Sequence, residues 1–220
     1  KNRVLNSSYG AAYFPWLRMR DEDTASTLWV PPSIAALGVM ANGDSRHELW
    51  FAPAGFTRGG LENSAGVKIV GVRQKLTSED RDKLYEASIN PIASFPAEGI
   101  VIFGQKTLQV TRSALDRINV RRLLIFLKKE ISRMAATVLF DQNVQQTWTR
   151  FLGKVVPFLD SVKSRLGLVA YKVILDETTT TPELIDRNIM YAKIILKPAR
   201  AIEFIALDFV ITDSGASFED

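Results

Sequence analysis

Apolar residues recur at three- and four-residue steps between Asn119 and Leu139, which is the spacing of one face of an amphipathic helix. The stripe consists of Val120, Leu123, Leu124, Leu127, Ile131, Met134, Ala135 and Val138. A second amphipathic helix is predicted from Gln145 to Arg165, and Pro157 inside it is expected to kink the helix or split it in two. Both segments are predicted to pack their apolar side into a core.

After Gly167 the pattern changes from helical spacing to that of strands. Three strands are predicted, at Leu168 to Leu175, Arg187 to Leu196 and Ile202 to Ile211. The short link from Lys197 to Arg200 favours a hairpin between the last two strands.

The N-terminal part of the chain contains short strand-like runs separated by turn residues. Strands are predicted at Ala11 to Leu17, where Pro15 indicates a sheet edge, and at Gly99 to Phe103. The stretch from Trp50 to Gly71 is rich in Gly, Pro and Asn, so we expect a long loop there.

Two further helices are predicted in this part. A proline pair precedes the first, which covers Ser33 to Met40 and is expected to end at Asn42 to Asp44. The second covers Ser78 to Ala87, with Ser78 as its N-cap and Asn90-Pro91 as its end.

This order of elements predicts an α+β (mixed α/β) fold, with a small mixed sheet, flanking helices and a C-terminal hairpin. The chain has 220 residues, 46% of them hydrophobic, which is enough to bury the core of one domain. The formal net charge of +4 is mild and selects neither nucleic acid nor an acidic protein as partner.

Composition argues against most catalytic chemistry. The absence of cysteine excludes disulfides, thiolate nucleophiles and cysteine zinc sites, and the single histidine, His47, excludes a histidine metal pair. The glycine-rich stretch Gly55 to Gly66 lacks the Gly-Lys-Ser/Thr ending of a phosphate-binding loop. No apolar run is long enough to cross a membrane. We therefore predict no enzyme activity, no metal and no cofactor.

A basic face is the first candidate site. On a helical wheel it lies opposite the apolar stripe, with only Asp116 and Glu130 to offset it nearby. It consists of Arg117, Arg121, Arg122, Lys128, Lys129 and Arg133. One interpretation is an electrostatic docking surface for an acidic protein or nucleic acid, and the other is a solvated helix face with local ion pairs.

The last predicted strand is the second candidate. A late apolar strand followed by a polar tail can pair with a sheet edge in another molecule, although an ordinary hairpin within the domain explains the same pattern. Its apolar residues are Ile202, Phe204, Ile205, Leu207, Phe209 and Ile211.

Seven stretches of the chain carry a family resemblance. They are WFAPAGFTRG (50–59), DRDKLYEASINPI (80–92), GIVIFGQKTL (99–108), SALDRINVRRLL (113–124), TPELIDRN (181–188), KPARAIEFIALDF (197–209) and the closing SGASFED. In this order they resemble the conserved C-terminal region of contractile tail sheath proteins of myovirus bacteriophages. The combination of the W-x-A-P-A-G-x-x-R-G loop, D-R-I-N-V-R-R and K-P-A-R-x-I is specific.

The resemblance implies a structural subunit of a phage tail. Sheath proteins of this kind stack as hexameric rings around an inner tail tube and contract to drive the tube through the host cell envelope. Their terminal arms add strands to the sheets of neighbouring subunits, so residues 202–211 would form a strand-donating C-terminal arm. The implied partners are further copies of the chain, the tube protein, and baseplate and tail terminator proteins, with no nucleic acid and no membrane.

The resemblance also implies a domain division and a location. Residues 1–28 would lead in from a preceding domain or linker, residues 29–210 would form the tail-sheath domain, and residues 211–220 would be the tail of the arm. The start KNRVLNSSYG does not begin with Met, so we expect the chain to be part of a longer protein. It would be made in the host bacterial cytoplasm and reside in the virion.

Two alternatives remain open from the sequence. One is the sheath of a related contractile device, such as a type VI secretion system or an R-type pyocin. The other is a nucleic-acid-binding module that uses the basic face, for which a steep loss of binding with salt is required.

Overall fold

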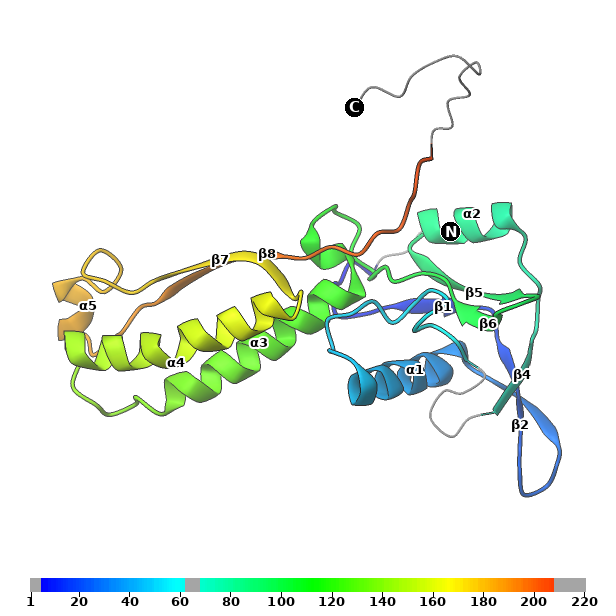
Figure 1. Ribbon diagram of the computed structural model, residues 1–220, viewed down its shortest axis with the longest axis horizontal. Coiled ribbons are helices and arrows are strands. Elements are labelled where there is room, and N and C mark those ends of the chain that lie inside the picture. Colours follow the sequence, from blue (N-terminus) through cyan, green and yellow to red (C-terminus); the bar gives the residue numbers. More distant parts are fainter. Residues whose placement is uncertain (1–4, 62–67, 208–220) are drawn as a thin grey trace, which may run out of the picture.

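The chain folds into two lobes that lie end to end (Figure 1). The structure is a computed structural model that describes residues 5–61 and 68–207. The N-terminal part forms a sheet lobe around one apolar core, and the part after residue 117 forms a helical lobe around a second. Mixed helices and small sheets confirm the predicted α+β class.

Six strands and two helices form the sheet lobe. The strands are β1 (Ala12–Phe14), β2 (Leu17–Arg20), β3 (Thr27–Val30), β4 (Lys68–Val72), β5 (Ile89–Phe95) and β6 (Gly99–Ile102). One sheet has the order β1-β5-β6 and is mixed, since β1 runs parallel to β5 and β6 runs antiparallel to it. The other has the order β3-β2-β4 and is antiparallel.

Helices α1 (Pro32–Arg46) and α2 (Ser78–Glu86) lie on opposite sides of the β1-β5-β6 sheet (Figure 1). The small residues Ala35, Ala36 and Val39 of α1 are buried against the sheets, which lets the helix approach them closely. The buried core of this lobe consists of those three residues with Leu17, Val30, Leu61, Ile69, Ile92, Ile100 and Ile102.

The helical lobe follows a short 3₁₀ turn, η1 (Ala114–Asp116). It contains α3 (Ile118–Ala136), α4 (Gln145–Ser164), β7 (Leu168–Ile174), α5 (Pro182–Asp186) and β8 (Lys193–Pro198). Strands β7 and β8 pair antiparallel and run along the two long helices (Figure 1). Their side chains Tyr171, Val173, Ile194 and Leu196 pack against the core, which is centred on Phe151, Val155, Leu159 and Val162 of α4.

Helix α4 runs unbroken through Pro157, so the predicted split of this helix is wrong. A proline inside a helix removes the hydrogen bond to the carbonyl four residues earlier and crowds that carbonyl. Here that residue is Gly153, and both Gly153 and Pro157 are exposed, so water can replace the lost bond. Burial of five apolar side chains on the opposite side holds the helix together.

The predicted C-terminal hairpin is also wrong. Strand β8 begins only at Lys193 and pairs with β7, in a register that places Ile174 opposite Lys193 and Tyr171 opposite Leu196. Residues 201–207 form no regular secondary structure, and residues 208–211 of the predicted third strand lie outside the described residues. The partner of β8 is therefore β7, the preceding apolar run, and not the later segment.

Several boundaries in the sheet lobe differ from the prediction because contacts distant in sequence override local turn signals. Helix α1 continues through Asn42 to Arg46, past the predicted end. Thr77, not Ser78, caps α2, with its hydroxyl accepting from the Asp80 backbone N–H at 3.2 Å. Strand β4 begins inside the predicted loop.

Asn90 lies within β5 and does not end a helix as predicted. Its side chain is fully buried and makes three hydrogen bonds. Its Nδ2 donates to the carbonyls of Ala12 and Lys106 at 3.1 and 2.8 Å, and its Oδ1 accepts from the Lys106 backbone N–H at 2.6 Å. Asn90 thus joins β1, β5 and the segment that follows β6.

Substitution Leu159→Ala is expected to lower the free energy of unfolding by about 2–5 kcal/mol, because it leaves a cavity in the helical core. Leu159 is 0% exposed, whereas Leu37, on α1, is 67% exposed. Leu37→Ala is the matched control and should change stability by less than about 0.5 kcal/mol. Urea denaturation followed by circular dichroism measures both, and equal shifts of the midpoint would contradict the packing described.

Substitution Asn90→Ala is expected to lower the free energy of unfolding by at least about 2 kcal/mol, because it leaves buried backbone groups without partners. The control is Asn42→Ala, since Asn42 is only partly buried in α1. Amide hydrogen exchange at Lys106 should accelerate in Asn90→Ala alone, and unchanged protection there would refute the role of this side chain.

Candidate functional site

The segment after β8 is the most unusual surface of the protein. Residues 199–207, which we call the arm, leave the helical lobe, cross the junction between the lobes and extend away from the body (Figure 1). Four of its apolar side chains are 74–83% exposed. They are Ile202, Phe204, Ile205 and Leu207, and all four belong to the predicted strand-donating residues. The other two, Phe209 and Ile211, lie outside the described residues.

The usual arrangement, with apolar side chains buried and charged side chains exposed, is reversed in the arm. The side chain of Glu203 is only 16% exposed, whereas the apolar side chains around it face outward. Its carboxylate accepts two hydrogen bonds from Arg117, from Nε at 2.6 Å and from Nη2 at 2.9 Å. A third comes from the side chain of Gln105, whose Nε2 lies 3.2 Å from Oε1. Paired bonds of this kind fix orientation as well as distance.

The local fold explains why Arg117 is available to the arm. Arg117 is extended, with φ −115° and ψ 138°, between η1 and α3. The chain that follows β6 runs alongside it, with the Ile118 N–H donating to the Gln105 carbonyl at 2.8 Å and the Thr107 N–H to the Asp116 carbonyl at 2.9 Å. Asp116 also pairs with Arg117 Nη1 at 3.1 Å, so the guanidinium is held on two sides.

Tyr85 and Lys106 complete this cluster, which we call the arm root (Tyr85, Gln105, Lys106, Asp116, Arg117, Glu203). Lys106 Nζ lies 4.1 Å from the centre of the Tyr85 ring and donates to the Tyr85 carbonyl at 2.7 Å. Burial, together with the charge of Glu203 and a hydrogen bond to it, raises the pKa of Tyr85 far above its ordinary value. Burial, reinforced by the positive charge of Arg117, lowers the pKa of Lys106.

Burial alone would lower the pKa of Arg117, but the hydrogen bond that it donates to Glu203 and the neighbouring charges raise it. Arg117 therefore remains charged while partly withdrawn from water. The cluster is suited to holding the arm, since each charge has a direct partner.

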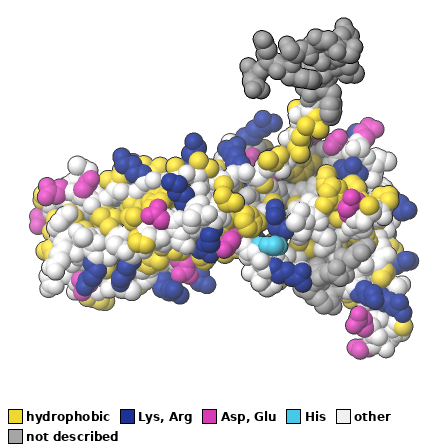
Figure 2. All heavy atoms as spheres, in the orientation of Figure 1, with side chains coloured by type: hydrophobic (Ala, Val, Ile, Leu, Met, Phe, Trp, Pro, Cys, Tyr) yellow, Lys and Arg dark blue, Asp and Glu magenta, His cyan; other side chains and the backbone are white. Residues whose placement is uncertain are grey.

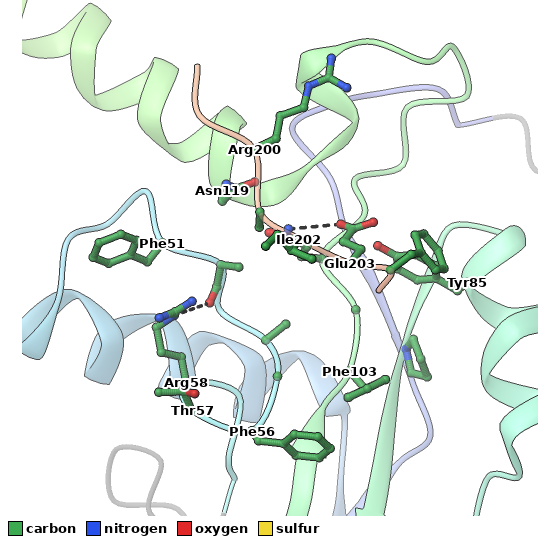
Figure 3. Close-up of a pocket in the computed structure, with 18 of the residues that line it drawn as sticks. Phe51, Phe56, Thr57, Arg58, Tyr85, Phe103, Asn119, Arg200, Ile202 and Glu203 are labelled. Carbon is green, nitrogen blue, oxygen red and sulfur yellow. Dashed lines mark hydrogen bonds between the residues drawn. The ribbon is translucent and has the colours of Figure 1, made fainter. Parts of the chain in front are cut away.

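A groove of about 650 Å³ lies beside the arm root. Aromatic side chains line it, including Phe51, Phe56, Tyr85 and Phe103, and the arm passes along its edge (Figure 3). Phe56 and Phe103 pack against Phe95 with ring centres 5.0–5.5 Å apart. The aromatic side chains make this groove a contact surface for apolar groups.

The structure divides the predicted basic face into two parts. The three arginines at the start of α3 bind groups of their own chain. Arg117 holds Glu203, Arg122 pairs with Asp44, and Arg121 lies 4.2 Å from the centre of the Tyr9 ring and donates to the Ser8 hydroxyl. The sequence offered only Asp116 and Glu130 as nearby partners for the basic face. The other partners of these arginines come from segments that are far away in sequence.

Further along α3, Lys128, Lys129 and Arg133 are exposed. Arg133 pairs with Glu130 at 3.2 Å on the helix surface. Figure 2 shows Lys and Arg side chains spread over both lobes, with acidic side chains among them. The six predicted residues thus do not form one continuous surface.

Sequence reasoning missed the arm root because its members come from four separate segments. The available signal was a single acidic residue, Glu203, flanked by apolar residues on both sides. Within residues 5–61 and 68–207, no group of three or more His, Asp or Glu residues is placed to hold a metal ion. The helices of the same ranges include none long and apolar enough to span a membrane.

Comparison with known proteins places this fold in a family. Residues 110–212 match the family model described as phage tail sheath C-terminal domain. The tail sheath protein of Enterobacteria phage T4 is 36% identical over 219 residues, which is 100% of this chain and 32% of that protein. The tail sheath protein of Vibrio phage KVP40 is 39% identical over 192 residues, 87% of this chain and 28% of that protein.

Among solved structures, the sheath complex of the extracellular contractile injection system PVC in its contracted state matches with a TM-score of 0.83 and 28% identity. The match covers 94% of this chain and 57% of that one. The chain therefore spans about a third of the length of the phage relatives and about half of this solved subunit. By its sequence and its fold, the chain belongs to the tail sheath proteins, and residues 110–212 are its phage tail sheath C-terminal domain.

Proposed function

We propose that this chain is part of the structural subunit of a contractile bacteriophage tail sheath. The subunits stack as rings around the inner tail tube, and their contraction drives the tube through the host cell envelope. The observation that carries this proposal is the end-to-end similarity to tail sheath proteins, joined to a fold that matches a sheath in its contracted state. The work is done by packing between subunits, with no bond-making by side chains.

The arm supports assembly through contacts with other copies. Its exposed apolar side chains have no cover within the described part of the chain. Within the same ranges, β7 and β8 pair only with each other, so their outer edges are available to an added strand. An arm from one subunit that adds to the sheet of another would bury these side chains and pair with one outer edge of that sheet.

The exposed lysines of α3 support a second kind of contact, with the tube. Exposed ion pairs contribute less than about 1 kcal/mol each. Contacts of that strength can hold an extended sheath against an acidic tube and still be broken one after another during contraction. We propose that Lys128 and Lys129 contribute to this surface.

A sheath of a related contractile injection system is the second candidate. The fold match to the PVC sheath favours it, whereas the sequence matches with T4 and KVP40 favour a phage tail. Electron microscopy of the particles that contain the protein separates the two, because only a phage carries a capsid on the tail.

The full-length protein that contains this chain is expected to form tubes visible by negative-stain electron microscopy. The double substitution Phe204→Ser and Leu207→Ser should raise the concentration needed for half-maximal polymerisation at least about tenfold, because two apolar side chains are no longer buried between subunits. Leu37→Ser, at a position on α1 that is also mostly exposed, is the control and should polymerise normally. Wild-type protein that never forms tubes and never binds tube protein would contradict the proposal.

Reversal of the two lysine charges, Lys128→Glu and Lys129→Glu, is expected to weaken binding of tube protein roughly tenfold at low salt. The difference should largely vanish at about 1 M NaCl, where charges are screened within about 3 Å. Lys75→Glu, an exposed position in the sheet lobe, serves as the control. Sedimentation with tube protein measures the affinity, and a loss that persists at high salt would argue against an electrostatic contact.

A further inference from the structure

The arm is attached to the body by its one inward-facing charge. Glu203 is 16% exposed at its side chain, while its neighbours Ile202 and Phe204 are 83% and 81% exposed. Withdrawing a carboxylate from water is unfavourable unless charged or hydrogen-bonding partners replace the water. Arg117 and Gln105 supply those partners, so the contact is specific and does not depend on the packing of apolar side chains around it.

This attachment lies where the two lobes meet. Gln105 belongs to the segment that follows β6 of the sheet lobe, and Arg117 immediately precedes α3 of the helical lobe. The hydrogen bonds from Ile118 to Gln105 and from Thr107 to Asp116 tie these two backbones together at 2.8 and 2.9 Å. In Figure 3, Glu203 lies between the start of α3, marked by Asn119, and Tyr85 of α2. One side chain of the arm therefore contacts both lobes.

The geometry at Glu203 also fixes a direction. The two bonds from Arg117, at 2.6 and 2.9 Å, come from one planar guanidinium, so they determine the angle of the carboxylate as well as its position. Arg117 is in turn held by Asp116 at 3.1 Å and lies 5.9 Å from the centre of the Tyr85 ring. A lysine at this position would keep the charge but lose the paired bonds.

On either side of Glu203 the arm is held differently. Before it, the Ala199 N–H donates to the Gly167 carbonyl at 3.1 Å and closes the end of the β7–β8 pair. After it, the described residues 204–207 make no side-chain hydrogen bond or ion pair and are exposed. Glu203 is thus the last point at which the described arm touches its own subunit through a polar side chain.

We propose that Glu203 anchors the arm to its own subunit through its hydrogen bonds with Arg117 and Gln105. A force that a second copy of the chain exerts on the arm then acts on the subunit at the junction of its two lobes. This anchor fixes where the arm leaves the subunit and in which direction its apolar residues point toward the neighbouring copy. The inference rests on the proposed sheath function for the origin of the pull, and on the contacts of Glu203 for the attachment itself.

The test uses the full-length protein with Glu203→Ala and Arg117→Lys, and with Glu183→Ala as the matched control, because Glu183 is exposed on α5. In dilute, unassembled protein, hydrogen exchange over residues 199–207 and trypsin cleavage after Arg200 should be at least about fivefold faster in Glu203→Ala. Arg117→Lys should fall between Glu203→Ala and the wild type, and Glu183→Ala should match the wild type. Assembled tubes of Glu203→Ala should dissociate at lower guanidinium concentration than wild-type tubes.

The outcomes separate the anchor from the function on which it rests. Unchanged exchange and cleavage in a folded Glu203→Ala variant would overturn the anchor. Faster exchange with tubes as resistant as the wild type would overturn its part in carrying load. Faster exchange, while even wild-type protein forms no tubes, would support the attachment and overturn the sheath function. Faster exchange together with weaker tubes would support the whole proposal.

Discussion

The two lobes are joined where an aromatic side chain of the sheet lobe is buried in the core of the other. Trp50 is 4% exposed, donates from its indole nitrogen to the Arg165 carbonyl at 2.9 Å, and packs on Phe126 with ring centres 5.9 Å apart. The ion pair between Glu48 and Arg165, at 2.8 Å, covers it from outside. The loop that carries Trp50 therefore brings the sheet lobe into contact with the core of the helical lobe, and the arm root lies beside this contact.

The arm concentrates exposed apolar side chains in one short segment, with four of them between residues 202 and 207. Along α3 and α4, by contrast, the apolar stripe faces the core. In the arm the pattern is reversed, with Glu203 inward and Phe204 outward. A subunit built to act alone gains nothing from this arrangement, whereas a subunit that is completed by neighbours does.

The sequence predicted the elements whose burial is local and missed those that depend on distant partners. The stripes of α3 and α4 and the strand β6 follow from periodicity alone. Asn90 carries a strong turn signal, but its amide is buried by partners 16 and 78 residues away and β5 forms through it. The basic face was predicted from a helical wheel, which cannot show that Asp44 and Glu203 reach Arg122 and Arg117. The resemblance in sequence identified the family. The arm root could be identified only from the three-dimensional structure, because its residues are distant in sequence.

The acidic residues after Arg200 bear on how two copies of this segment would meet. A run of exposed Ile, Phe and Leu side chains with strand propensity is the kind of segment that stacks on copies of itself. Every ionisable side chain after Arg200 is acidic: Glu203, Asp208, Asp213, Glu219 and Asp220. Like charges repel, so two such segments resist lying side by side. The same acidity leaves the exposed Ile, Phe and Leu side chains of residues 202–207 better matched to a surface that is not itself acidic.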